Sequence, residues 1–339
     1  MKPSKDSTPV ITYVITSDDV NKRLDVIARV VFPFLQLSQI FQAIRKGVIR
    51  VNHQKSKGNV RLIMHDTISY HGVIPEDITK VPEKTSSKVF LSPKINPRMQ
   101  TEYQHLDILL ETSDIVIINK PTSWISHGSP PALTSWLQWK YGTTQSVSFN
   151  MSPVHRLDVG TSGANILAKT ISGARTASDL LQQHRIKKIY LAIVEGKLEH
   201  SIHSSVYLDR INKKTFVSSY ASSISSKQAI TTIHPLVSTA QYSLVACLIE
   251  TGRTHQIRAV TAYHHYPLVG DMLYNTPMRA RTSSNNQQYF LHCYLLIDES
   301  QSLFNTIKAP LPDAFIREMK NLDIFITPSQ LLNICTQLL

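Results

Sequence analysis

Cysteine is scarce in this sequence, which has only Cys247, Cys293 and Cys335 among its 339 residues. The three are widely separated, odd in number and without paired spacing, so they indicate neither a disulfide framework nor a thiolate zinc site. We expect buried or half-buried free thiols in a protein kept in the reducing cytoplasm.

Long apolar runs are also missing, since no stretch approaches the roughly 20 residues that a membrane-spanning helix needs. The apolar run near the N-terminus, residues 10–15, is short, is interrupted by Thr12, and is followed by Asp18 and Asp19. This pattern is not that of a signal peptide. We expect a soluble, cytoplasmic protein that has no membrane partner.

Acidic residues are too few to balance the basic ones: 24 against 36, for a formal net charge of +12. Such an excess favours a polyanionic partner, and a nucleic acid or an anionic membrane surface would both fit. Residues 1–75 contain eleven basic and five acidic side chains. Half of the excess therefore lies in less than a quarter of the chain.

The first unit that the pattern predicts covers residues 11–75 and is a compact α+β module. Helical apolar spacing follows the polar cluster at 17–19 and continues to residue 31. A second helix fits 38–46 and stops at Gly47, and short strands fit 48–52 and 65–70.

Residues 76–104 are rich in proline and polar side chains without an apolar period, which indicates a linker. Residues 105–330 then predict a larger domain, with helices at 171–184 and 254–265 and several strand-like runs. Strands outnumber helices and do not alternate regularly with them. We therefore expect a mixed or largely antiparallel sheet, and an α+β fold class overall.

The segment at 155–163, His-Arg-Leu-Asp-Val-Gly-Thr-Ser-Gly, leads directly into an apolar strand. Such a loop can present Asp158 at a cleft, with Gly160 and Gly163 allowing tight backbone turns. The plain alternative is a surface turn with an Arg–Asp pair. A second alternative is the phosphate-binding turn of actin-like sugar kinases, but the segment lies at mid-chain and no glycine-rich partner loop follows.

The segment at 251–258, Thr-Gly-Arg-Thr-His-Gln-Ile-Arg, joins a strand to a predicted helix. Thr251 or Thr254 could cap that helix. Arg253, His255 and Arg258 make the junction favourable for an anion. The alternative is a helix with a solvated basic face.

Together these segments resemble the RluA/RluC/RluD family of pseudouridine synthases, the RluC-like branch most nearly. The resemblance covers 155–169, the Lys-x-Tyr-x-Ala-x-Val-x-Gly strand at 188–196, and 251–258 without a change. Further agreement lies at 119–121, at 267–271 with Tyr274, and at 291–292, all in family order. The resemblance implies a pseudouridine synthase catalytic domain.

The resemblance also implies the reaction, which is the isomerisation of specific uridines to pseudouridine in RNA. The RNA that it implies is large-subunit ribosomal RNA. Asp158 would be the essential carboxylate, acting either on the sugar carbon or on its 2′ proton. Arg258 would pair with it, and a nearby cation favours a charged carboxylate. The reaction needs no cofactor and no metal, and we expect a monomer.

The remaining site residues follow from the same resemblance. Tyr190 would pack against the target uracil, although a plain core tyrosine is the alternative. Arg156 would fill the space that the base leaves when it is flipped out of the stack. The other expected substrate contacts, each of which could instead be a structural hydrogen-bonding group, are Lys120, His155, Arg253 and His255.

The N-terminal unit resembles the S-four-like RNA-binding module that some members of the family carry. The residues expected to contact RNA are Lys22, Arg23, Arg45, Lys46 and Arg50. The tripeptide Arg-Leu-Asp occurs at 23–25 and at 156–158, but only the second copy is followed by Thr-Ser-Gly. We therefore interpret Asp25 as structural.

Three positions depart from the family pattern: Ser123 replaces a usual glycine, Asn165 a usual leucine, and Val260 a usual histidine. They concern local packing and substrate fit. The rival function is a catalytically inactive RNA-binding factor for ribosome assembly. Binding alone, however, requires no carboxylate beside phosphate, so the presence of Asp158 argues for the enzyme.

Overall fold

The computed structural model describes residues 10–74, 97–128, 130–142, 146, 149–212, 214–275 and 289–338. Contacts divide the chain into two compact units, the first made of residues 1–95, 137–151 and 170–172, and the second of the remainder. Most of the predicted linker, residues 76–96, lies outside the described residues. Its last part was predicted wrongly, because Pro97–Gln104 is helix α4 and the apolar ring of Tyr103 is buried.

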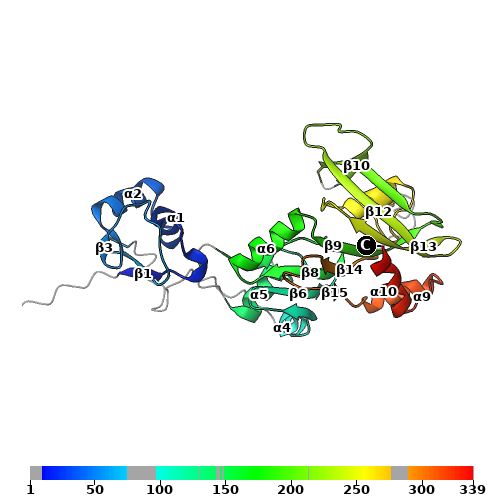
Figure 1. The fold of residues 1–339 in the computed structure, drawn as a ribbon, viewed down its shortest axis with the longest axis horizontal. Coiled ribbons are helices and arrows are strands. Elements are labelled where there is room, and N and C mark those ends of the chain that lie inside the picture. Colours follow the sequence, from blue (N-terminus) through cyan, green and yellow to red (C-terminus); the bar gives the residue numbers. More distant parts are fainter. Residues whose placement is uncertain are drawn as a thin grey trace, which may run out of the picture. The chain divides into compact units, whose positions relative to one another are not determined.

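The first unit contains a four-stranded antiparallel sheet in the order β1-β4-β2-β3 within the described residues (Figure 1). Its elements are β1 (Ile11–Val14), the 3-10 helix η1 (Ser17–Asp19), α1 (Leu24–Val31), α2 (Leu37–Lys46), β2 (Ile49–Val51), β3 (Gln54–Lys55) and β4 (Thr67–Tyr70). Apolar side chains of both helices and of the strands form one core.

The two helices of this unit differ slightly from the prediction. Residues 20–23 are not helical, because backbone hydrogen bonds to the segment around Leu62 hold them: Asn21 N–H donates to Leu62 O, and Leu62 N–H donates to Lys22 O. Helix α2 ends where predicted, at Gly47, whose φ of 73° is in the left-handed region. Glycine occupies that region without steric cost.

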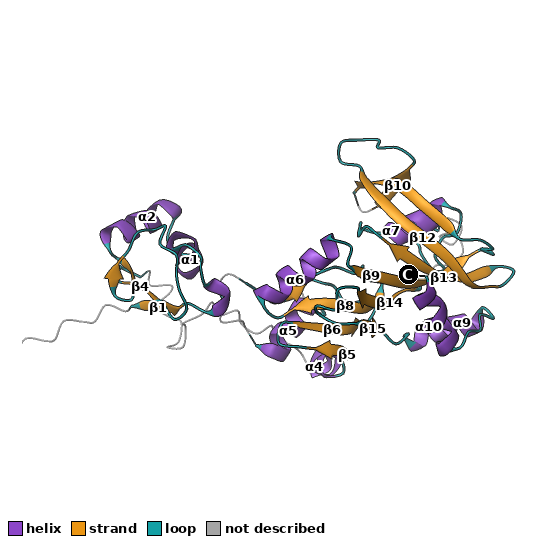
Figure 2. Cartoon of the chain, in the orientation of Figure 1, coloured by secondary structure: helices purple, strands orange, loops and turns teal. Residues whose placement is uncertain are grey.

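The second unit is built on an eleven-stranded sheet within the described residues, and Figure 2 shows it as one continuous layer. The main order is β11-β10-β12-β13-β9-β14-β8-β6-β5, with β15 paired to β14 and β7 to β8. The strands are β5 (Ile108–Glu111), β6 (Ile115–Lys120), β7 (Ser152–Pro153), β8 (Ser162–Ala168), β9 (Ile186–Glu195), β10 (Ile202–Ile211), β11 (Lys214–Ser218), β12 (Lys227–Ser238), β13 (Tyr242–Ile249), β14 (Leu291–Asp298) and β15 (Thr306–Lys308). Among the described pairs only β8 and β14 run parallel. The expected α+β class with a mixed, largely antiparallel sheet is confirmed.

Helices cover both faces of this sheet. They are α4, α5 (Leu133–Tyr141), α6 (Ile171–Gln182), α7 (Gln256–Tyr263), α9 (Asp313–Asn321) and α10 (Pro328–Gln337). Strand β9 is buried on both sides: alternate residues from Tyr190 to Val194 share a core with α6 and α7, and those from Ile189 to Ile193 share another with α9 and α10. Because α10 packs into that second core, the domain continues beyond the predicted end at residue 330.

The three cysteines are buried free thiols, as expected. None of the helices in the described ranges is long and apolar enough to cross a bilayer.

Candidate active site

Asp158 lies on the loop between β7 and β8. The loop is closed by a turn in which Thr161 N–H donates to Asp158 O at 3.0 Å. From the segment after β6, Ser123 N–H donates to Val159 O at 2.8 Å. Backbone hydrogen bonds at Asp158 and Val159 therefore hold the loop that carries the Asp158 carboxylate, which is 16% exposed.

The two glycines of this loop are required by close approach. A Cβ at Gly163 would lie 2.3 Å from Cys293 O, across the one parallel strand pair described, and the residue has φ +110°. A Cβ at Gly160 would lie 2.8 Å from the ring of Tyr289, although its φ is not left-handed. Glycine was predicted to allow a tight backbone turn at both positions, but only Gly163 has a positive φ.

Lys120 links the same loop to the segment after β6. Its side chain is fully buried, and Nζ donates to Pro121 O, Trp124 O and Val159 O at 2.9, 3.0 and 3.5 Å. Burial lowers the pKa of this ammonium to about 7, against the opposing effect of Asp158. Of the two roles that the sequence left open for Lys120, these carbonyl partners favour the structural hydrogen-bonding group over the substrate contact.

His155 also has a structural partner, because its Nε2 accepts the N–H of Ile166 at 3.1 Å. Burial lowers its pKa to about 3, so the ring is neutral. His292 bridges Ser162 Oγ at 2.8 Å and Ala309 O at 3.1 Å. Of the two readings the sequence left for His155, the structure favours the structural hydrogen-bonding group.

The turn before α7 is held by Gln256. Its Oε1 accepts the Thr251 hydroxyl at 2.8 Å and the Arg253 N–H at 2.9 Å, and its Nε2 donates to Ile230 O and to Thr231 Oγ1 at 3.0 Å. Neither predicted threonine caps the helix: the N-cap is His255, in the left-handed region with φ 56°. The role of Gln256 was not predicted, because interpreting the motif as an anion site gives no reason to single out this residue.

Arg258 is anchored by Asp271, which the sequence analysis did not assign. Nε and Nη2 donate to the two carboxylate oxygens at 2.7 and 2.8 Å, and Asp271 is fully buried. The guanidinium also lies near two aromatic rings, with its Cζ 4.2 Å from the ring centre of Tyr289 and 5.1 Å from that of Tyr274. Burial opposes the charge, but the hydrogen bonds to Asp271 outweigh it and raise the pKa of Arg258. The matched segment 267–271 was the available signal for Asp271.

Two cationic or protonatable groups face Asp158 at longer range. Arg258 Nη1 and His255 Nε2 are each 3.9 Å from Asp158 Oδ2. His255 Nδ1 lies 3.0 Å from the Tyr274 hydroxyl, which accepts the N–H of Thr215. Burial lowers the pKa of His255, and the neighbouring Asp158 acts in the opposite direction.

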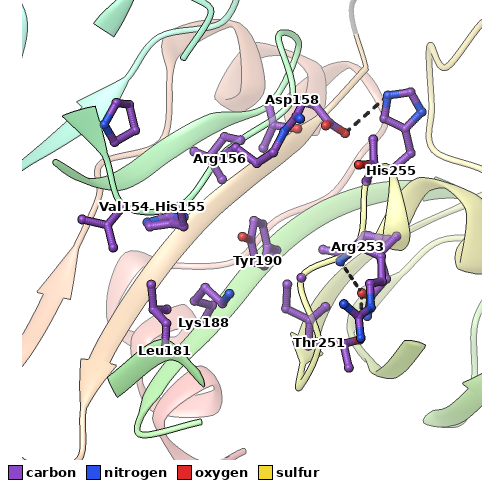
Figure 3. A pocket seen from close by; sticks show the side chains of 18 of the residues that line it. Val154, His155, Arg156, Asp158, Leu181, Lys188, Tyr190, Thr251, Arg253 and His255 are labelled. Atoms are coloured by element: carbon purple, nitrogen blue, oxygen red, sulfur yellow. Dashed lines mark hydrogen bonds and ion pairs between the residues drawn. The ribbon is translucent and has the colours of Figure 1, made fainter. Parts of the chain in front are cut away.

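Asp158, Tyr190 and Arg258 line one cavity of about 670 Å³, a size that suits a small ligand or one nucleotide. Figure 3 shows Tyr190 on the floor of this cavity, between Asp158 and His255 on one side and Lys188 on the other. Arg156 and Arg253 also line it and are exposed, whereas Tyr190 is buried. A second cavity of about 1050 Å³ shares Asp158 with the first. The structure thus brings seven of the eight predicted catalytic and substrate-binding residues together, and Lys120 is not among the residues that line the first cavity.

In the first unit, Arg45, Lys46 and Arg50 are exposed at the end of α2 and on β2. Lys22 is half-buried. Arg23 donates to both carboxylate oxygens of Asp25, at 3.0 and 2.8 Å, and Asp25 is 2% exposed. These bonds agree with the interpretation of Asp25 as structural, and they engage part of the Arg23 guanidinium.

The three departures have structural counterparts. Ser123 has φ +72°, a conformation that glycine adopts more readily. Asn165 is fully buried: its Nδ2 lies 3.4 Å from His155 O, and its Oδ1 has no partner among the described residues. Val260 is fully buried in the apolar core. Asn165 and Val260 thus lie in the interior, whereas Ser123 lines a cavity together with Asp158.

Groups of three or more histidine, cysteine or carboxylate side chains that could hold a metal ion are not found in the described ranges.

The model of the family described as RNA pseudouridylate synthase matches residues 114–263. The ribosomal large subunit pseudouridine synthase D of Borreliella burgdorferi is 30% identical over 263 residues, which are 70% of this chain and 78% of that protein. The ribosomal large subunit pseudouridine synthase C of Escherichia coli is 28% identical over 284 residues, 80% of this chain and 82% of that protein.

Among solved structures, human RNA pseudouridylate synthase domain containing 4 superimposes with a TM-score of 0.55 at 20% identity, over 68% of this chain and 98% of that one. At that identity the likeness concerns the fold. The curated relatives carry both the C and the D names, so they confirm the RluA/RluC/RluD resemblance at the level of the family. The chain belongs to the RNA pseudouridylate synthase family and is an isomerase that converts uridine in RNA to pseudouridine.

Proposed function

We propose that this enzyme modifies uridines of large-subunit ribosomal RNA and that Asp158 is its essential carboxylate. The substrate rests on the names of the relatives in Borreliella burgdorferi and Escherichia coli, both of which are ribosomal large subunit enzymes. An excess of 12 positive charges suits such a polyanionic substrate.

The observation that carries the proposal is the position of the Asp158 carboxylate. It is 16% exposed and lines a cavity whose floor is Tyr190, with Arg258 3.9 Å away. The backbone hydrogen bonds around it and the buried pair of Arg258 with Asp271 hold these groups before substrate arrives. Such preorganisation is what a reaction at a single carboxylate requires.

The other cavity residues have roles that suit a flipped nucleotide. Tyr190 offers the face of its ring to the detached uracil, which must stay bound while it rotates and rejoins the ribose through carbon. Arg156 is exposed at the cavity and carries a flat guanidinium that can stack where the target base has left the helix. Extracting a base costs roughly a few kcal/mol, and a stacking substitute offsets part of that cost.

The test of the carboxylate is Asp158→Asn, which keeps size and polarity but cannot act as nucleophile or base. We expect RNA binding to persist and single-turnover formation of pseudouridine to disappear. The matched control is Asp25→Asn, because it alters the other Arg-Leu-Asp tripeptide. Asp25→Asn should lower the stability of the first unit and leave the single-turnover rate at saturating RNA intact. Product formation by Asp158→Asn would contradict the assignment.

The test of the substrate is a map of pseudouridines in ribosomal RNA from cells with and without the gene, with the Asp158→Asn allele as a third sample. We expect the same large-subunit positions to be lost in the deletion and in the allele. Loss confined to another RNA class would contradict the proposed substrate.

We further infer that residues 11–75 supply RNA affinity, while the chemistry lies in the second unit. The exposed pair Arg45 and Lys46 at the end of α2 supports this division. Each lost phosphate contact lowers the slope of log affinity against log salt by about 0.7 to 0.9. Replacing both side chains with glutamine should therefore reduce the slope by about 1.5. The control replaces Arg317 and Lys320, two exposed cations of α9, and should leave the slope unchanged. Equal slopes for all three proteins would contradict this division of roles.

A further inference from the structure

Lys188 lies on the floor of the cavity beside Tyr190 and has no role in the site described so far. Both residues belong to β9 and are two positions apart, so their side chains point to the same face of the sheet. Both line the cavity of about 670 Å³. Figure 3 shows Tyr190 between Asp158 and Lys188, so the ammonium is on the side of the base-binding ring that is remote from the carboxylate.

The Lys188 ammonium has no partner among the residues that the structure describes. In the described part of the chain, no acceptor lies within hydrogen-bond distance of its Nζ and no carboxylate lies within 4.0 Å. Two other lysines of the same unit are paired: Lys187 Nζ is 3.6 Å from Glu299 Oε1, and Lys169 Nζ is 3.1 Å from Glu111 Oε1. Lys188 is also half-buried, and burial lowers its pKa. A partly desolvated cation without a counterion is unfavourable, and an anion supplied by a ligand would relieve that cost.

The surroundings favour an anion at this position. Among the described residues, the arginine, lysine and carboxylate side chains that line the cavity are four cations and two carboxylates, namely Arg156, Lys188, Arg253, Arg258, Asp158 and Glu250. The chain passes close to the ammonium at Gly252, where an added Cβ would lie 3.8 Å from Lys188 Nζ. A larger residue there would cover the ammonium, so glycine leaves it open to the cavity.

We propose that Lys188 binds the backbone phosphate of the nucleotide next to the target uridine. This inference rests on the proposed function, in which the target uracil lies against Tyr190. Two residues along a strand span about 7 Å, which is comparable to one step along an extended nucleic-acid strand. A phosphate adjacent to a uridine held at Tyr190 therefore reaches Lys188. The residue positions the strand and touches no reacting atom, because Tyr190 separates it from Asp158.

The test compares Lys188→Gln with Lys187→Gln in the full chain. The two variants remove the same charge from adjacent positions, but Lys187 pairs with Glu299 and is not among the residues that line the cavity. Binding of a large-subunit ribosomal RNA transcript is measured over a range of salt concentrations. We expect Lys188→Gln to reduce the slope of log affinity against log salt by about 0.7 to 0.9, the value for one phosphate contact. Lys187→Gln should keep the wild-type slope. At saturating RNA, Lys188→Gln should keep the wild-type turnover rate, with the deficit confined to KM.

A third variant, Lys188→Arg, keeps the charge and should keep the salt slope, which a purely structural role for the side chain would not predict. A wild-type slope for Lys188→Gln, or an equal reduction for Lys187→Gln, would overturn the inference. So would a loss of turnover at saturating RNA with the slope unchanged, since that would place Lys188 in the chemistry. The proposed function fails separately, if the wild-type chain makes no pseudouridine in the same transcript.

Discussion

Replacing Asp271 by asparagine should show how far the active site depends on the ion pair with Arg258. Asp271 is fully buried, and its two oxygens accept from Arg258 at 2.7 and 2.8 Å. Breaking a buried pair by removing one partner costs about 3–5 kcal/mol. Asparagine keeps the size and one oxygen of the aspartate, so we expect the lower end, about 3 kcal/mol. For a domain of this size, that corresponds to a fall in Tm of roughly 6–12 °C.

The assay is thermal unfolding followed by tryptophan fluorescence, because Trp124 and Trp136 are buried in the second unit. The control is Asp158→Asn, because the wild-type Asp158 carboxylate is 3.9 Å from Arg258 and partly exposed. Loss of so long a contact should cost less than about 1 kcal/mol. We expect Asp158→Asn to be inactive with a Tm near that of the wild type. Asp271→Asn should melt earlier and, well below its Tm, should make pseudouridine slowly, since Arg258 has lost its anchor. A Tm for Asp271→Asn within about 2 °C of the wild type would refute this account of the pair.

Three further outcomes follow from the packing. Gly163→Ala should prevent accumulation of folded protein, because its Cβ would lie 2.3 Å from Cys293 O. Gly252→Ala, whose Cβ would have no contact nearer than 3.8 Å, should fold, and the yields of soluble protein for the two variants test this. Ser123→Gly should raise the stability by about 0.5–1 kcal/mol, because it relieves a left-handed φ of 72° at some entropic cost; a lower Tm would contradict this. Burial lowers the pKa of His292 to about 4, so between about pH 6.5 and 4 the unfolded chain binds more protons than the folded one. The free energy of unfolding should therefore fall by on the order of 3 kcal/mol as the pH drops through that range. A plot of urea midpoint against pH should be flatter for His292→Asn than for the wild type, and parallel curves would refute this.

Local patterns in the sequence were sufficient for most secondary structure and for the location of the chemistry. The stop of α2 at Gly47 follows from the φ of that one residue, and the apolar runs of β9 and β14 follow from β propensity and burial. Asp158 and Arg258 could be named as site residues because each lies within one contiguous motif, at 155–163 and at 251–258. Such features depend on residues a few positions apart, which the order of the sequence displays directly.

Tertiary structure decided which side chains meet and which remain free. Lys120 and Lys188 are both lysines on strands. Lys120 is enclosed by three carbonyl groups, whereas Lys188 lines the cavity and has no partner within the described ranges. Arg258 pairs at close range with Asp271, and only at 3.9 Å with Asp158, which is 100 positions away in the sequence. The sequence determined that a carboxylate and several cations would gather at the Asp158 loop. Their pairing depends on strand register, backbone carbonyl positions and burial, all of which arise only when distant segments pack together.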